Sequence, residues 1–358
     1  MKGGSGWEPS THAEGVACAV AALICWGTWS NALKVCGVRW ELFYVDYVLA
    51  CVFASLLAAA SLGPPSALSL TSVPVRQAGY ALAAGVVFNI ANLLVTLAIT
   101  LIGMATAFPL SIGTALAVGA ALNYALAPKG SLLLLSAGCV LALAAVGCMG
   151  GAYAAYGRSR RKQRQSETLG SADPLLQTPD EGGSGGEKTA MSLQAKVGLC
   201  VGAGILMGSW SPLCVSSMNG AEGISAYEAM ILFTLGMVIS SCVALPAVAR
   251  WPVEHGLPPL SVGALGLAWV NRSTMVSHLA GVVGGGMWFV GTLMSLISGP
   301  KLGFAVSYSI GQCAPLAAAI WGIFLWREFA HADLLTVAAL TGVFLFYGGA
   351  IASLALSS

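Results

Sequence analysis

Two stretches decide the fold: Trp26-Gly27-Thr28-Trp29-Ser30, and Met207-Gly208-Ser209-Trp210-Ser211, which lies 181 positions later. Each lies inside the first long apolar segment of its half of the chain. The repeat predicts two similar halves, each with about five membrane-spanning segments. Because five is an odd number, the second half would enter the membrane from the opposite face. We therefore expect two inverted five-helix repeats around a site at mid-membrane depth.

The composition is that of a polytopic membrane protein. Of the 358 residues, 57% are hydrophobic and 8% are charged, and the mean hydropathy is +0.82. A soluble domain carries about 25% charged residues, so this chain could not cover its surface in water. Apolar runs of roughly 20 residues predict transmembrane helices rather than the short alternating strands of a β-barrel. The expected fold class is all-α.

Charge is concentrated in one segment. Of the 30 Asp, Glu, Lys and Arg residues, 11 lie between Gly157 and Leu193. This segment is otherwise rich in Ser, Gly and Pro and has too little apolar surface to fold alone. We expect three parts: a first five-helix repeat at 1–156, a disordered basic linker at 157–193 and a second five-helix repeat at 194–358.

Hydropathy predicts ten spans, most of them long enough to cross a core of about 30 Å. Their expected positions are near 15–33, 43–63, 78–99, 102–126, 131–156, 195–218, 226–249, 275–297, 302–326 and 333–356.

The orientation follows from the Lys and Arg residues on each side. Of the 16 in the chain, 12 lie on the side that carries the linker and 4 on the side that carries both termini. The linker is therefore expected in the cytosol and both termini outside or in a lumen. The chain is expected to be a multi-pass protein of the plasma membrane or an endomembrane.

No catalytic constellation is visible, so an enzyme is not expected. The four histidines have no metal-ligand neighbour at helical spacing, and the ten cysteines are scattered through apolar segments without a C-x-x-C pair. We expect no cofactor, no metal and no nucleic-acid partner. The expected partners are a small molecule and the lipid bilayer, and a homodimer is compatible with the sequence.

Polar groups at membrane depth are costly and are therefore functional candidates. Asp46 lies about one turn into the second span, and Glu228 opens the seventh. Both follow a tyrosine closely, so they are interpreted as counterparts in the repeat and as candidates for proton coupling. The alternative for Asp46 is an interfacial acid paired with Arg39 or Lys34.

Amide and aromatic side chains are the candidates for substrate binding. Asn89 and Asn92 are three residues apart and share a helix face. Amides can bind a heterocycle or a sugar, or else hold helices together. Asn123 lies near a span end and is expected at the interface. Flat aromatic rings can stack on a ring-shaped substrate or simply pack. The candidate substrate-binding residues are Trp29, Ser30, Asn89, Asn92, Trp210, Ser211, Trp288, Tyr308 and Gln312.

At these residues the chain resembles the ureide permease family. The motifs that carry the resemblance cover nearly the whole chain in order: Gly27-Thr28-Trp29, Tyr44-Val45-Asp46-Tyr47, Ser211-Pro212, Tyr227, Gln312-Cys313-Ala314-Pro315-Leu316, Trp321-Gly322-Ile323-Phe324-Leu325 and Glu328. Glucose/rhamnose-type sugar transporters of the wider drug/metabolite transporter superfamily share several of them. The chain departs from the family pattern in lacking an intact phosphate-loop motif in its linker and in having a short first connection.

The resemblance implies ten helices, a long cytosolic central loop and the uptake of ureides or related oxo-nitrogen heterocycles, such as allantoin and uracil, together with protons. We expect a secondary active transporter driven by a proton gradient. Two alternatives stay open: a sugar or sugar-derivative transporter of the same superfamily, and a membrane receptor or scaffold that transports nothing.

Overall fold

The computed structural model describes residues 6–170, 192–252, 257–272 and 274–358, which form helices and turns without a strand. Ten helical segments in these residues are long and apolar enough to cross a membrane, which confirms the expected all-α fold class. Four spans are single helices of the first half: α3 (Trp40–Leu62), α4 (Val75–Ile102), α5 (Met104–Leu126) and α6 (Leu132–Gly170). A fifth single helix, α7 (Leu193–Met218), opens the second half. Three more are α8 (Ala226–Arg250), α10 (Met275–Leu302) and α13 (Leu334–Ser357).

The first and ninth spans are broken. The first consists of α1 (His12–Thr28) and α2 (Ser30–Cys36), with Trp29 between them. The ninth consists of α11 (Phe304–Gly311), α12 (Pro315–Ile320) and a π-helical turn, Trp321–Leu325. Breaks and π-turns free backbone groups, which membrane proteins tolerate where the backbone faces other protein segments.

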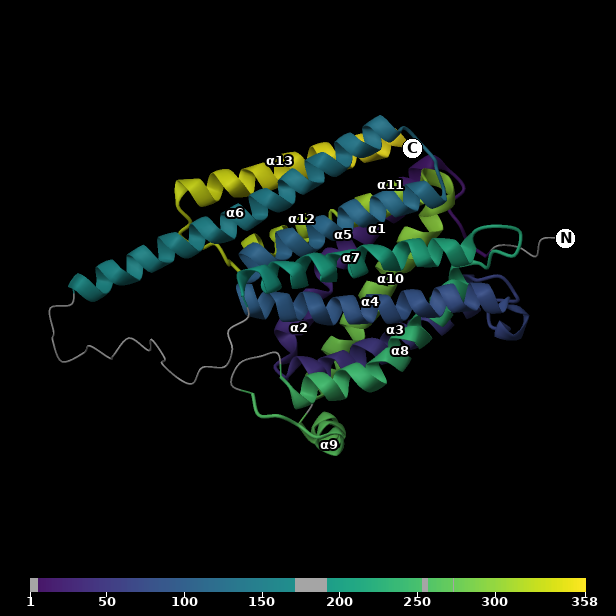
Figure 1. The fold of residues 1–358 in the computed structure, drawn as a ribbon, viewed down its shortest axis with the longest axis horizontal. Helices are drawn as coiled ribbons and strands as arrows, with labels where there is room; N and C mark the ends of the chain where they lie inside the picture. The colour runs from purple at the N-terminus through teal and green to yellow at the C-terminus, as the bar shows by residue number, and fades with distance from the viewer. Residues whose placement is uncertain (1–5, 171–191, 253–256, 273) are drawn as a thin grey trace.

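The ends of the helices lie at two opposite faces of the molecule. At one face, the His12 ring nitrogen Nε2 lies 2.7 Å from the Ser358 hydroxyl, so the start of α1 meets the end of α13. At the other face, Lys196 at the start of α7 donates a hydrogen bond to the carbonyl of Leu101 at the end of α4 (3.4 Å). We call these the terminal face and the linker face. The helices α1 and α7 therefore start at opposite faces (Figure 1).

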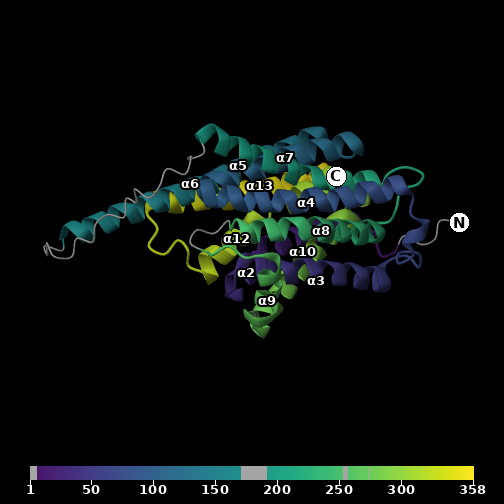
Figure 2. The ribbon, with the colours of Figure 1, turned by 60° about the horizontal axis from the view of Figure 1, so that its bottom comes forward.

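Helix neighbours correspond when the two halves are exchanged. α1 packs on α10 as α7 packs on α4, and α3 packs on α10 as α8 packs on α4. The fifth and tenth spans, α6 and α13, pack along each other at one side of the molecule (Figures 1 and 2). Together with the opposed directions of α1 and α7, this correspondence supports the predicted inverted repeat.

Glycines bring the central helices into close contact. A Cβ atom added at Gly85 of α4 would lie 1.9 Å from the Phe233 carbonyl oxygen of α8, and one added at Gly285 of α10 would lie 2.2 Å from the Tyr47 carbonyl oxygen of α3. In lipid, such close approach of backbones replaces the hydrophobic force that drives packing in water. Gly85 and Gly285 hold corresponding places in the two halves.

The predicted boundaries differ from the structure in two places. α6 continues to Gly170, so residues 157–170 are helical where the linker was expected to begin; good helix formers such as Arg, Lys, Gln and Glu fill this stretch. Residues 171–191 of the predicted linker lie outside the described residues. The sequence also gave no indication of α9 (Val262–Arg272), a short apolar helix before the eighth span. The break between the third and fourth spans, expected near 99–102, lies one residue later at Gly103, which has φ +79°.

Gly85→Ala is expected to destabilise the protein, because its methyl group would overlap the α8 backbone. Overpacking of this kind costs about 1–3 kcal/mol. The matched control is Gly79→Ala on the same helix, where an added Cβ meets no atom within 4 Å. Thermal unfolding in detergent measures the difference. Equal midpoints for the two variants would contradict the close contact.

Candidate substrate site between the two halves

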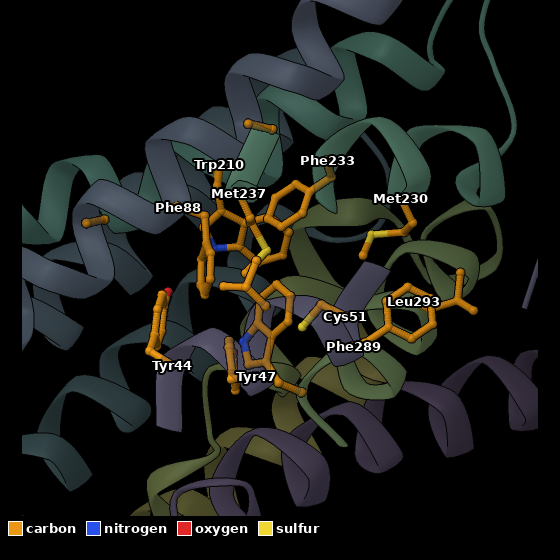
Figure 3. Close-up of a cluster of buried hydrophobic side chains, with 14 of the residues drawn as sticks. Tyr44, Tyr47, Cys51, Phe88, Trp210, Met230, Phe233, Met237, Phe289 and Leu293 are labelled. Atoms are coloured by element: carbon orange, nitrogen blue, oxygen red, sulfur yellow. The ribbon is translucent and has the colours of Figure 1, made fainter. Parts of the chain in front are cut away.

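Five aromatic side chains from both halves of the chain meet in the centre of the molecule, and we call them the aromatic centre: Trp26, Phe88, Trp210, Phe233 and Trp288. The ring centroids of Phe88 and Trp288 are 4.3 Å apart, and Phe233 stacks on Trp288 at 5.7 Å. Trp210 meets Trp26, Phe88 and Phe233 edge-on at 5.8–6.2 Å. Figure 3 shows Phe88, Trp210 and Phe233 side by side. Trp210 and Trp288 were predicted site residues, and both are buried here.

The aromatic residues correspond between the halves. Phe88 and Trp288 each lie three positions after the glycine that makes the close contact, Gly85 or Gly285. The carbonyls that these glycines touch belong to Phe233 and Tyr47. Trp210 packs on Phe233 at 5.8 Å as Trp29 packs on Tyr47 at 5.3 Å. The repeated Trp motif therefore places Trp29 and Trp210 in matching positions.

Tyr47 links Trp29 to the aromatic centre. Its ring lies 6.1 Å from Trp288 and stacks on Tyr44 at 5.1 Å. Figure 3 shows Tyr44 and Tyr47 next to the Phe88 and Trp210 group. Ser30 follows Trp29 as the first residue of α2 and is half-buried.

The two predicted asparagines lie beside Tyr44 but differ in their surroundings. Asn89 is fully buried; its Oδ1 accepts from the Tyr44 hydroxyl (2.7 Å), and its Nδ2 donates to the hydroxyls of Ser240 (2.8 Å) and Ser241 (3.0 Å). These bonds join α3, α4 and α8, so Asn89 holds helices together. Asn92 is half-buried, and its Nδ2 donates to the Tyr44 hydroxyl (3.2 Å). Its Oδ1 has no hydrogen-bond partner in the described part of the chain, which makes it the more available amide.

Other predicted residues lie on the α5 side of the centre. The Ser211 hydroxyl accepts a hydrogen bond from Asn123 Nδ2 (3.0 Å), and the Tyr308 hydroxyl donates to the Ala115 carbonyl (3.0 Å). Gln312, in the break after α11, lies near the Tyr308 hydroxyl. Asn123, which was expected at the membrane interface, lies three residues before the end of α5 and is fully buried under α7; its Oδ1 has no partner among the described residues.

Asp46 has a partner that the sequence did not predict. One carboxylate oxygen lies 2.9 Å from His278 Nδ1 of α10, and the other accepts a hydrogen bond from Trp269 Nε1 of α9 (3.1 Å). The two residues proposed as its partners bind elsewhere: Arg39 pairs with Glu41 and Lys34 with Glu328. Asp46 is nearly buried, and it immediately precedes Tyr47 in the chain.

Glu228 is not the counterpart of Asp46. Its carboxylate accepts hydrogen bonds from the Ser225 backbone and hydroxyl (both 2.8 Å) and forms the capping box of α8 at the terminal face. Because Phe233 matches Tyr47, the residue that matches Asp46 is Leu232. The aromatic–acid pattern therefore aligned the two halves about one helical turn out of register, at Glu228 instead of Leu232.

A polar layer joins the first and ninth spans at the linker face. The Lys34 ammonium pairs with Glu328, which also accepts from the Tyr153 hydroxyl (3.2 Å). Two indole N–H groups at the end of the ninth span donate hydrogen bonds to side chains of the first span: Trp321 to Thr28 (2.9 Å) and Trp326 to Asn31 (2.5 Å).

Sequence reasoning missed four residues that the structure brings to the site: Tyr47, Phe88, Phe233 and His278. Tyr47 stood within a quoted motif but only as part of the resemblance. The available signal for Phe88 was its position three residues after Gly85, which matches the position of Trp288 after Gly285. In the described residues, no group of three or more His, Cys, Asp or Glu is placed to hold a metal ion.

The ten apolar helical segments of the described residues define a multi-pass integral membrane protein. Three curated proteins of Arabidopsis thaliana are similar to it along nearly their whole length. Ureide permease 1 is 25% identical over an alignment of 388 positions that covers 96% of each chain. For ureide permease 4 the identity is 25% over an alignment of 404 positions that covers 97% of this chain and 98% of that protein. For ureide permease 2 it is 25% over an alignment of 395 positions that covers 96% of each.

These full-length similarities support assignment of the chain to the ureide permease family, as its motifs predicted. No family model matches the chain. A solved crystal structure shares the fold, with a TM-score of 0.53 and 15% identity over 95% of this chain and 96% of the other.

Asn89→Ala is expected to destabilise the protein more than Asn92→Ala. The first change removes the acceptor of a buried hydroxyl and the donor of two serines, and each buried polar group left unpaired costs about 1–3 kcal/mol. The second removes one bond at a half-buried position, worth about 0.5–1.5 kcal/mol. Thermal unfolding in detergent gives the comparison, and an equal loss in both variants would show that Asn89 does not hold the helices together.

Proposed function

We propose that this protein is a secondary active transporter that imports ureides or related oxo-nitrogen heterocycles together with protons. The observation that supports the proposal best is the meeting of aromatic rings from both halves around amides, in a chain with full-length similarity to ureide permeases. Planar rings with carbonyl and N–H groups match such a site, because aromatic faces stack on the ring and an amide offers both donors and an acceptor.

The two opposed halves supply a route for alternating access. In transporters built from inverted repeats, the substrate binds at the repeat interface, and rocking of one helical set against the other exposes it to each side in turn. The aromatic centre contains residues of α1, α4, α7, α8 and α10, which belong to both halves. A substrate held there would contact both sets of helices and so would bias their movement.

The Asp46–His278 pair is the proposed proton site. Carboxylate and imidazole lie within hydrogen-bond distance, so a proton can be held by either group. The pair bridges α3 and α10, and a Cβ at Gly281 of α10 would lie 2.4 Å from the Asp46 Cβ. A change of charge here acts on the same helix contact that holds Tyr47 against α10. Glu228 stays a second prediction for this role, although its carboxylate already caps α8.

The main alternative cargo is a sugar. Amides and indoles also bind sugars, which present hydroxyl edges and apolar faces. Competition separates the two proposals: allantoin or uracil, and not glucose or rhamnose, should reduce uptake of a labelled heterocycle. A receptor or scaffold that transports nothing would give no uptake of any of these compounds.

Uptake of labelled allantoin, uracil and glucose into proteoliposomes that contain the purified protein tests the proposed function. We expect saturable uptake of at least one heterocycle, faster when the outside pH is lowered by about one unit and abolished by a protonophore. Empty liposomes are the control. Uptake of glucose alone would favour the sugar alternative, and uptake that does not respond to pH or the protonophore would contradict proton coupling.

Asp46→Asn is expected to abolish the acid stimulation of uptake, because the amide cannot exchange a proton with His278. His278→Gln, which keeps a hydrogen-bonding side chain, should flatten the same pH profile. Glu228→Gln is the comparison, since glutamine still accepts the capping hydrogen bonds, and it should leave the profile unchanged. A profile lost in Glu228→Gln and kept in Asp46→Asn would move the proton role to Glu228.

A further inference from the structure

Tyr47 has a hydroxyl with no hydrogen-bond partner. The residue is 0% exposed, and its hydroxyl oxygen is one of the few buried side-chain polar atoms left unpaired in the described part of the chain. Other buried tyrosines near the centre are paired: Tyr44 with Asn89 and Asn92, and Tyr308 with Ala115. An unpaired buried hydroxyl destabilises a fold, and phenylalanine would fill the same space without it.

The other half of the protein has a phenylalanine at the matching place. Phe233 receives Gly85 as Tyr47 receives Gly285, and each ring packs on the tryptophan of the repeated motif. Phe233 makes these contacts without a hydroxyl. The packing role of this position therefore does not require the Tyr47 hydroxyl, and its presence needs another explanation.

The surroundings of Tyr47 fit a planar ligand with few polar groups. Its ring contacts Trp29, Tyr44 and Trp288, which are large flat faces. Another polar group without a complete set of partners is Asn92, whose Nδ2 donates to the hydroxyl of Tyr44, the ring stacked on Tyr47, and whose Oδ1 has no partner among the described residues. A sugar with hydroxyls around its rim would leave several of them unpaired against these aromatic faces, which is costly. A cyclic amide has two or three polar groups in one plane.

We infer that the Tyr47 hydroxyl is a substrate-binding group that donates a hydrogen bond to a ring carbonyl of a planar nitrogen heterocycle. The inference rests on the proposed function and assigns the residue that selects such rings over sugars. In this proposal Asn92, whose Nδ2 donates to Tyr44, accepts at its Oδ1 from a ring N–H of the same ligand, whereas Asn89, with its bonds already made, keeps a structural role.

Tyr47→Phe is the test, with transport and stability measured on the same preparations. We expect an about 3- to 10-fold rise in KM for uracil, which corresponds to one lost hydrogen bond, and an unchanged or raised unfolding temperature. Tyr347→Phe is the matched control: its hydroxyl is also buried and unpaired, but the residue lies on α13 in a separate core cluster. That variant should keep the wild-type KM.

Ligand analogues distinguish binding from packing. Competition by 2-pyrimidinone and 4-pyrimidinone, each lacking one uracil carbonyl, is measured against both proteins. If Tyr47 donates to one carbonyl, the analogue that lacks it should bind wild type and Tyr47→Phe equally, while uracil does not. Equal KM values for uracil in the two proteins, or an equal penalty for all three rings, would overturn the inference.

The outcomes also separate this inference from the proposed function. Wild-type protein that takes up no heterocycle contradicts the proposed function, whatever the variants do. Wild-type protein that takes up uracil, with Tyr47→Phe identical to it, leaves the function standing and overturns the role of Tyr47. Tyr44→Phe is expected to lose stability, because the Tyr44 hydroxyl is bonded to Asn89 and Asn92. A similar loss in Tyr47→Phe would assign the Tyr47 hydroxyl a structural role and would also overturn the inference.

Discussion

The centre of this protein depends on two helix crossings in which glycine lets backbones touch. At Gly85 the α4 helix meets the α8 backbone, and at Gly285 the α10 helix meets the α3 backbone. Lipid gives no hydrophobic reason for helices to associate, so contact at this distance is what makes dispersion and hydrogen bonding effective. These contacts bring Phe88 and Trp288, each about one turn after its glycine, to the centre of the molecule, where their ring centroids are 4.3 Å apart.

The two halves share their packing but not their chemistry. Where one half has Tyr47 and Asp46, the other has Phe233 and Leu232 at the corresponding positions. Likewise, Asn89 of the first half corresponds to Phe289 of the second. Polar groups at membrane depth cost free energy unless they are paired, so a duplicated unit can keep its shape with apolar residues throughout. The departures from symmetry lie next to the glycine contacts, and they include the unpaired hydroxyl and the carboxylate–imidazole pair. The candidate functional groups are therefore the ones in which the two halves differ.

Hydropathy was sufficient to predict ten spans, because a span is a matter of length and composition. It was not sufficient for side-chain partners. The pairing of Asp46 with Glu228 was wrong by one turn, because register is set by where Gly85 and Gly285 meet their neighbours, and no local pattern contains that contact. Asn123 is a related case, because its proximity to a span end says nothing about whether another helix, here α7, covers the residue. The Trp29 and Trp210 repeat succeeded because a rare residue in a repeated motif marks the register directly.

The polar layer at the linker face limits how the halves can move. Rocking of the first span away from the ninth must break the Lys34–Glu328 ion pair and the two indole bonds from Trp321 and Trp326. Partly exposed ion pairs contribute about 0–1 kcal/mol and single hydrogen bonds about 0.5–1.5 kcal/mol, so the layer holds one arrangement without trapping it. The glycine crossings, in contrast, bury backbone against backbone and have no such low-cost alternative. Movement is thus expected where side chains join spans one and nine, with α3, α4, α8 and α10 turning as packed pairs around the aromatic centre.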